Sequence, residues 1–85
     1  MKEFQYAIRD KIGLHARPAG LLVQKSKTFQ SDVFISFNGK KADAKRIFAL
    51  MGLSIKTEDR ITVQISGADE ETAEKELEDF MKNNL

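Results

Sequence analysis

The chain contains no cysteine and no tryptophan, and it has one proline and one histidine among its 85 residues. Without cysteine it forms no disulfides, no thiolate zinc site and no cysteine nucleophile. One histidine is too few for a typical zinc site, which takes three or four protein ligands. The sequence therefore predicts no bound metal and no cofactor that depends on thiolates.

Long apolar runs are also missing. No stretch approaches the roughly 20 apolar residues that a membrane-spanning helix needs. The first residues alternate between polar and apolar side chains, unlike a signal peptide. We therefore expect a cytoplasmic protein that does not insert into a membrane.

The length of 85 residues and the hydrophobic fraction of 41% indicate one domain, residues 1–85, with one core. The net charge of +1 conceals an asymmetry. Residues 1–68 carry 12 basic and 6 acidic side chains (+6), whereas residues 69–85 carry 2 basic and 7 acidic ones (−5). A basic body would steer acidic partners toward it. The positive charge is too dispersed for a strong nucleic-acid binder.

Hydrophobic periodicity predicts seven elements in the order βαββαβα. The expected strands lie near 4–8, 33–37, 40–43 and 61–65, and the expected helices cover 18–28, 46–53 and the segment that follows Asp69. Asn38-Gly39 supplies the tight turn of a hairpin, because both residues accept positive φ. Such a pattern gives an α+β fold of two layers.

The last two helices carry more specific expectations. Asp69 is placed to cap the final helix, whose predicted buried positions are Ala73, Leu77, Phe80 and Met81. The short helix over 46–53 is apolar on two sides. Leu50 and Leu53 are expected in the core, and the other apolar side is expected at the surface as a partner site. The alternative is a short helix that is buried on both sides.

The single histidine lies in the run Gly13-Leu14-His15-Ala16-Arg17-Pro18, where a helix is expected to begin. Neither His15 nor Ala16 caps a helix well, so the first amides are left free to bind an anion. An inert histidine is the commoner case for a lone residue, and a nucleophilic triad has no elbow motif here. Imidazole beside free amides and Arg17 instead suits reversible phosphorylation of a ring nitrogen.

At this point the sequence resembles the histidine-containing phosphocarrier (HPr) family of the bacterial sugar phosphotransferase system. The resemblance covers essentially the whole chain. It is carried by four pieces: Gly13-Leu14-His15-Ala16-Arg17-Pro18-Ala19, Asn38-Gly39-Lys40, Ala44-Lys45 and Ser66-Gly67-Ala68-Asp69-Glu70.

The resemblance implies an open-faced β-sandwich, a four-stranded antiparallel sheet covered on one face by three helices. It implies that His15 accepts a phosphoryl group through Nδ1, that Arg17 steadies this group, and that the amides of Ala16 and Arg17 bind its oxygens. The donor would be phosphorylated enzyme I and the acceptors IIA domains of sugar permeases. The protein would be a monomeric carrier, not an independent catalyst, and would need no cofactor.

A docking surface is expected around His15. Leu21 lies one turn beyond Arg17, away from the core side of its helix, and Gly20 would let a partner approach closely. The remaining expected docking residues are Ile47, Phe48 and Met51, with Lys27, Lys45 and Arg46 as a charged rim. For Lys45 alone, an ordinary solvated lysine is the commoner case.

The chain departs from the family pattern at three places. Many Gram-positive members have a regulatory serine where this chain has Arg46, so regulation by serine phosphorylation is expected to be lost. Ile12 replaces a small polar residue, which leaves a specialised, non-sugar branch open as an alternative. The turn Thr57-Glu58-Asp59 lacks a usual glycine. A regulatory binding module that is never phosphorylated is a second alternative, and nucleic-acid binding through the basic residues from Lys40 to Arg46 is a weaker third one.

Overall fold

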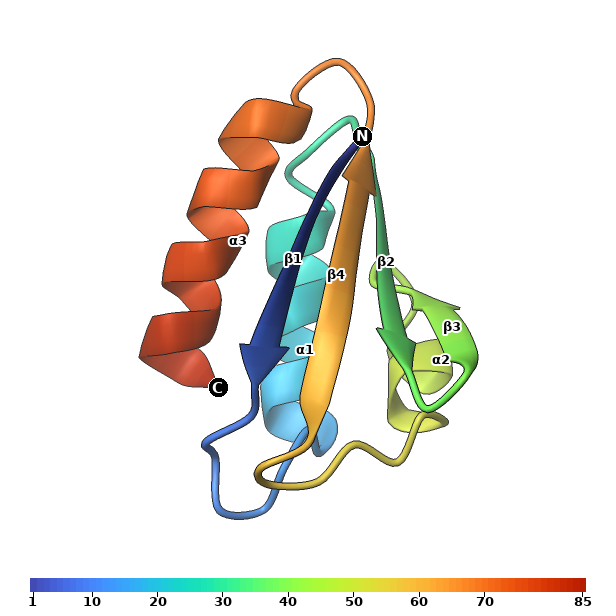
Figure 1. Ribbon diagram of the computed structural model, residues 1–85, viewed down its shortest axis with the longest axis vertical. Coiled ribbons are helices and arrows are strands. Elements are labelled where there is room, and N and C mark those ends of the chain that lie inside the picture. Colours follow the sequence, from blue (N-terminus) through green and yellow to red (C-terminus); the bar gives the residue numbers. More distant parts are fainter.

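The chain forms β1 (Lys2–Ala7), α1 (Ala16–Ser26), β2 (Asp32–Phe37), β3 (Lys40–Asp43), α2 (Ile47–Met51), β4 (Arg60–Ser66) and α3 (Glu70–Asn84). A computed structural model describes all 85 residues (Figure 1). The predicted βαββαβα order is confirmed, and most boundaries differ by one or two residues. No helix is long and apolar enough to cross a membrane.

The four strands form one antiparallel sheet in the order β1-β4-β2-β3. The register places Val33 opposite Ile65 and Ile35 opposite Val63, so the apolar side chains of the two central strands share one face. The opposite face carries polar residues such as Glu3 and Gln64, which bond to each other. The expected open-faced β-sandwich is therefore confirmed.

The core lies between the apolar face of the sheet and the three helices. Leu22 of α1, Leu50 of α2 and Leu77 of α3 are fully buried against strand residues such as Ile35 and Ile65. Figure 1 shows α1 running behind the sheet and α3 alongside β1, with α2 near the β3 edge. This arrangement brings the first turn of α1 and the end of α3 to the same end of the sheet (Figure 1).

Phe80 was expected in the buried stripe of α3, and this prediction was wrong. Ala73, Leu77 and Met81 are fully buried, but Phe80 is only half-buried and packs against the margin of the core. It lies beside Lys25 in a shallow groove between α1 and α3. A groove that stays open to solvent leaves one face of the ring uncovered.

The prediction that Asp69 caps α3 with its side chain was also wrong. Asp69 occupies the N-cap position, but its carboxylate makes no cap hydrogen bond. It accepts instead from the Ser31 hydroxyl and from the amides of Gln30 (2.9 Å) and Ser31 (2.8 Å). The carboxylate therefore connects the start of α3 to the loop between α1 and β2, which a local cap rule does not foresee.

These bonds predict an acid-sensitive contribution to stability. The Ser31 hydroxyl, and then the Gln30 N–H, lower the pKa of the Asp69 carboxyl. Because its folded pKa lies below the unfolded value of about 3.9, the contribution is present above that value and is lost as pH falls through the folded pKa. We expect Asp69→Asn to lower the melting temperature at neutral pH and to flatten its decline between about pH 5 and pH 3.

Thermal unfolding followed by circular dichroism over that pH range measures this effect. Glu70 adds to the acid sensitivity of both proteins, because the Gly67 N–H and then the N-terminal ammonium lower its pKa. The control is Asp32→Asn, since the Asp32 side chain is exposed and makes no hydrogen bond or ion pair. A wild-type pH profile in Asp69→Asn contradicts the assigned role.

Candidate functional site

A tight turn carries the chain from β1 to α1. The Gly13 N–H donates to the Asp10 carbonyl (3.0 Å), which closes a four-residue turn with Asp first and Gly last, the usual placement in a type I turn. The next amide, that of Leu14, donates to the Ile55 carbonyl (3.1 Å), and the Leu14 side chain is buried. His15 therefore follows a residue that is fixed in the core.

His15 is the N-cap of α1, with extended backbone (φ −92°, ψ −173°) and no side-chain cap hydrogen bond. The Ala16 and Arg17 amides lie in the first turn, where helix geometry offers them no acceptor. No loop carbonyl or side chain accepts from them either, and the first turn contains no acidic residue. The predicted uncapped helix start at His15 is confirmed.

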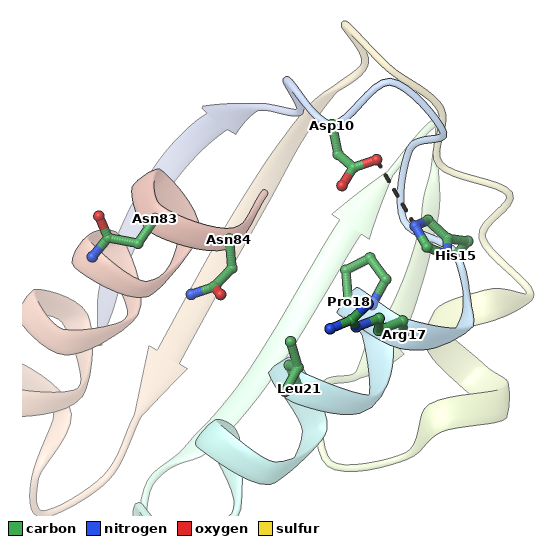
Figure 2. A pocket seen from close by; sticks show the side chains of 7 residues that line it. All are labelled: Asp10, His15, Arg17, Pro18, Leu21, Asn83 and Asn84. Atoms are coloured by element: carbon green, nitrogen blue, oxygen red, sulfur yellow. Dashed lines mark ion pairs between the residues drawn. The ribbon is translucent and has the colours of Figure 1, made fainter.

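The imidazole opens onto a cavity of about 330 Å³. Its lining residues are Asp10, His15, Arg17, Pro18, Leu21, Asn83 and Asn84 (Figure 2). Arg17 is exposed and makes no ion pair or hydrogen bond, so its guanidinium is available to an incoming anion. A phosphoryl group on the ring would thus meet both a helix N-terminus and a free guanidinium.

Asp10 also belongs to this site, although it was not among the residues predicted from the sequence. Its Oδ1 lies 3.8 Å from His15 Nε2 and accepts a hydrogen bond from the Ile12 amide (2.9 Å). Asn83 and Asn84, at the end of α3, close the far side of the cavity in Figure 2 and were also missed. The Asp-x-x-Gly spacing was a usable signal for Asp10, whereas only the fold brings the two asparagines here.

Of the expected docking residues, three apolar ones are exposed: Leu21 (41%), Phe48 (84%) and Met51 (39%). Ile47 is different, because it is half-buried and packs against the core. A Cβ on Gly20 would lie 3.7 Å from Ile47 Cδ1, so Gly20 faces α2 and not open solvent. The prediction that the Ile47 side chain lies at the surface was therefore wrong.

The basic residues also divide into two groups. Lys27 and Arg46 are exposed and have no hydrogen-bond or ion-pair partner on their side chains. Lys45 is half-buried, and its Nζ donates to the Phe29 carbonyl (3.1 Å). Lys45 is therefore not an ordinary solvated lysine, because its ammonium is bonded to the loop after α1. We take Leu21, Phe48, Met51, Lys27 and Arg46 together as the docking face.

Comparisons with known proteins identify the family of this chain. The family model described as the PTS HPr component phosphorylation site matches residues 2–83. The phosphocarrier protein HPr of Mycoplasma genitalium is 38% identical over 85 residues, which cover 99% of this chain and 97% of the relative. The crystal structure of HPr from Thermoanaerobacter tengcongensis superimposes with a TM-score of 0.94 at 38% identity, over 99% of this chain and 94% of that one.

A second kind of relative is equally similar. The HPr-like protein Crh of Bacillus subtilis is 39% identical over 85 residues, the full length of both chains. A crystal structure of that Crh, described as a dimer with a swapped domain, gives a TM-score of 0.78 and covers 100% of this chain and 98% of its own. Since the family model and relatives of both kinds span nearly the whole chain, this protein belongs to the HPr family, a family of phosphocarriers that are not independent catalysts.

Proposed function

We propose that this protein is a monomeric phosphocarrier that accepts a phosphoryl group on His15 from phosphorylated enzyme I and donates it to IIA domains of sugar uptake. The observation that carries the proposal is the position of His15, the N-cap of α1 with the Ala16 and Arg17 amides unused. Amides at a helix start bind anions, and the free Arg17 guanidinium adds a full positive charge.

The transfer needs no group beyond donor and carrier. The lone pair of Nδ1 attacks phosphorus, the new N–P bond forms, and the bond between phosphorus and the donor breaks with its electron pair returning to the donor. Donation to a IIA domain reverses these roles, and Nδ1 recovers its electron pair. The amides of Ala16 and Arg17 offset the negative charge of the phosphoryl oxygens in both directions.

We further propose that enzyme I and IIA domains bind the docking face. Leu21 lines the cavity, and Phe48 and Met51 of α2 are also exposed. An exposed apolar patch with a charged border is typical of a protein contact. Lys27 and Arg46 supply positive charge at its border. The partner surface that fits is apolar at its centre with acidic residues around it.

Incubation with phosphoenolpyruvate and enzyme I, followed by intact-mass measurement, tests the function. We expect a gain of one phosphoryl group per chain, lost in acid and retained in base, as for a phosphohistidine. The gain should require enzyme I, because the chain is a carrier. No gain in mass on the folded wild-type protein contradicts the proposal.

Two alternatives to this function each rest on one observation. The similarity to Crh of Bacillus subtilis, described as a catabolite repression protein, favours a regulatory binding module, and the presence of both His15 and Arg17 speaks against a module that is never phosphorylated. A specialised, non-sugar branch of phosphotransfer is favoured by Ile12, which is 71% exposed beside the site. Phosphoryl uptake in the experiment above distinguishes the carrier from the binding module. The rates of phosphoryl transfer to IIA domains of different branches distinguish sugar uptake from a specialised branch.

We also propose that this member has lost regulation by serine phosphorylation. Arg46 is the N-cap of α2, and the resemblance to the family implies that it stands where many members have the regulatory serine. Arginine has no hydroxyl to phosphorylate. With HPr kinase and ATP we expect no acid-stable phosphate on the wild-type protein. Arg46→Ser is the matched variant, and a HPr that carries the serine is the positive control for the kinase. Stoichiometric acid-stable phosphate near α2 in the wild type contradicts the proposal.

A further inference from the structure

Asp10 is held in place more firmly than an exposed loop residue needs to be. Its own amide donates to the Leu85 carbonyl (2.9 Å), and its carbonyl accepts from the Gly13 amide (3.0 Å). Its side-chain Oδ1 accepts from the Ile12 amide (2.9 Å). Backbone and carboxylate are thus both held, and the carboxylate cannot leave its position without losing its hydrogen bond from the Ile12 amide.

The fixed carboxylate faces one nitrogen of the imidazole. Asp10 Oδ1 lies 3.8 Å from His15 Nε2, and both side chains are about one-third exposed (36% for His15 and 30% for Asp10). Figure 2 shows this pair at the mouth of the cavity, with Arg17 further along α1. The distance is too long for a direct hydrogen bond, so the interaction is electrostatic. His15 makes no other ion pair and no side-chain hydrogen bond.

We propose that Asp10 is a positioning residue for His15, and that its carboxylate keeps the imidazole hydrogen on Nε2 and leaves the lone pair of Nδ1 free for phosphorus. The inference rests on the proposed function, in which Nδ1 is the acceptor. A negative charge favours an N–H dipole directed toward it over a lone pair directed toward it. A carboxylate beside Nε2 therefore favours the form with the hydrogen on Nε2 and the lone pair on Nδ1.

The same carboxylate assists the transfer step. A neutral imidazole that gives its Nδ1 lone pair to phosphorus becomes positively charged, while the hydrogen stays on Nε2 and the donor receives the electron pair of its broken bond. Asp10 lies on the Nε2 side of the ring, so it offsets this positive charge. A carboxylate that orients a histidine and stabilises its cationic form is the role of the aspartate in serine protease triads.

Imidazole nitrogen NMR on the unphosphorylated, 15N-labelled protein tests the positioning role directly. At a pH where the ring is neutral, we expect Asp10→Asn to lower the ratio of the Nε2–H to the Nδ1–H form by about two- to five-fold, the size expected for a partly exposed charge contact. The asparagine keeps an oxygen for the Ile12 amide, so the turn is preserved. Asp59→Asn is the matched control, because Asp59 accepts the Lys56 amide in the adjacent loop (2.8 Å).

Transfer kinetics with phosphorylated enzyme I give the second measurement. With Asp10→Asn as the phosphoryl acceptor, we expect the kcat of enzyme I to fall several-fold. The KM of enzyme I for this carrier should not change, since Asp10 lies outside the docking face. With Asp59→Asn we expect neither constant to change. If the wild-type protein is phosphorylated but Asp10→Asn has the wild-type tautomer ratio and kcat, the positioning role alone is overturned. A folded wild-type protein that takes no label overturns the proposed function itself.

Discussion

The His15→Ala protein is expected to remain folded and to take up no phosphoryl group from phosphorylated enzyme I. The chain has one histidine, so no second imidazole is available to accept the group. The His15 side chain is about one-third exposed and makes no cap hydrogen bond, and substitutions at such sites change stability by about 0.5 kcal/mol or less. Intact mass and the melting temperature measure the two halves of this expectation.

A matched substitution makes the loss specific. Gln24→Ala also changes an exposed polar residue of α1, but it lies more than two turns from His15, so we expect full labelling at the wild-type rate. Acid-labile phosphate that persists on a folded His15→Ala protein identifies a different acceptor. That result contradicts the assignment of His15 even if the protein remains a phosphocarrier.

Much of the fold follows from local sequence patterns. The alternation in β2 and β4 marks one face of each strand, and the structure buries those faces together. Asn38 and Gly39 both adopt positive φ (52° and 78°), as the hairpin between β2 and β3 requires. These elements were predictable because periodicity and turn chemistry act over a few residues and do not depend on the rest of the chain.

Contacts between distant segments were not predictable in the same way. Asp69 has the position and the side chain of a helix cap, but its carboxylate accepts hydrogen bonds from the Ser31 hydroxyl and amide instead of from α3. The sequence alone favours a solvated side chain for Lys45. In the structure the loop after α1 places the Phe29 carbonyl where it accepts a hydrogen bond from Lys45 Nζ. Local sequence shows which side chains need hydrogen-bond partners, whereas the tertiary fold determines which groups those partners are.

The candidate site shows the same division. His15 and Arg17 were predicted from the absence of a cap, a signal that lies within four residues. Asn83 lies 68 positions further along the chain and reaches the cavity only because α3 ends beside α1. Ile47 was placed at the surface by helical periodicity, but its neighbour Gly20 leaves room for it between α1 and α2. Small residues on a facing helix decide how much of an amphipathic edge is buried.

Replacing Gly13 by alanine is expected to destabilise the protein by about 2 to 5 kcal/mol. Gly13 has φ of +83°, where a side chain costs about 1 to 2 kcal/mol. A Cβ there would lie 2.6 Å from the Ile55 carbonyl oxygen and 2.6 Å from Lys56 Cα, both backbone atoms that cannot rotate away. Forcing atoms into a packed site adds about 1 to 3 kcal/mol. Urea unfolding of the wild type and the variant measures the difference.

Gly20→Ala is the control for this prediction, because it adds the same methyl group where there is room. The new Cβ would lie 3.7 Å from Ile47 Cδ1, an ordinary contact, and alanine is favoured over glycine within a helix by about 1 kcal/mol. We therefore expect Gly20→Ala to be as stable as the wild type or up to about 1 kcal/mol more stable. Equal stability of Gly13→Ala and wild type contradicts the assigned constraint.

The loss in Gly13→Ala should extend from stability to phosphoryl transfer. The close approach at Gly13 allows the Leu14 amide to reach the Ile55 carbonyl at 3.1 Å, and this bond fixes the residue directly before His15. A methyl group at position 13 must push the two loops apart, which weakens the bond and moves the imidazole relative to the first amides of α1. We expect slower labelling of Gly13→Ala at a temperature where it is still folded, with Gly20→Ala labelled at the wild-type rate. Normal labelling of the folded Gly13→Ala protein would show that the turn supports the fold without positioning His15.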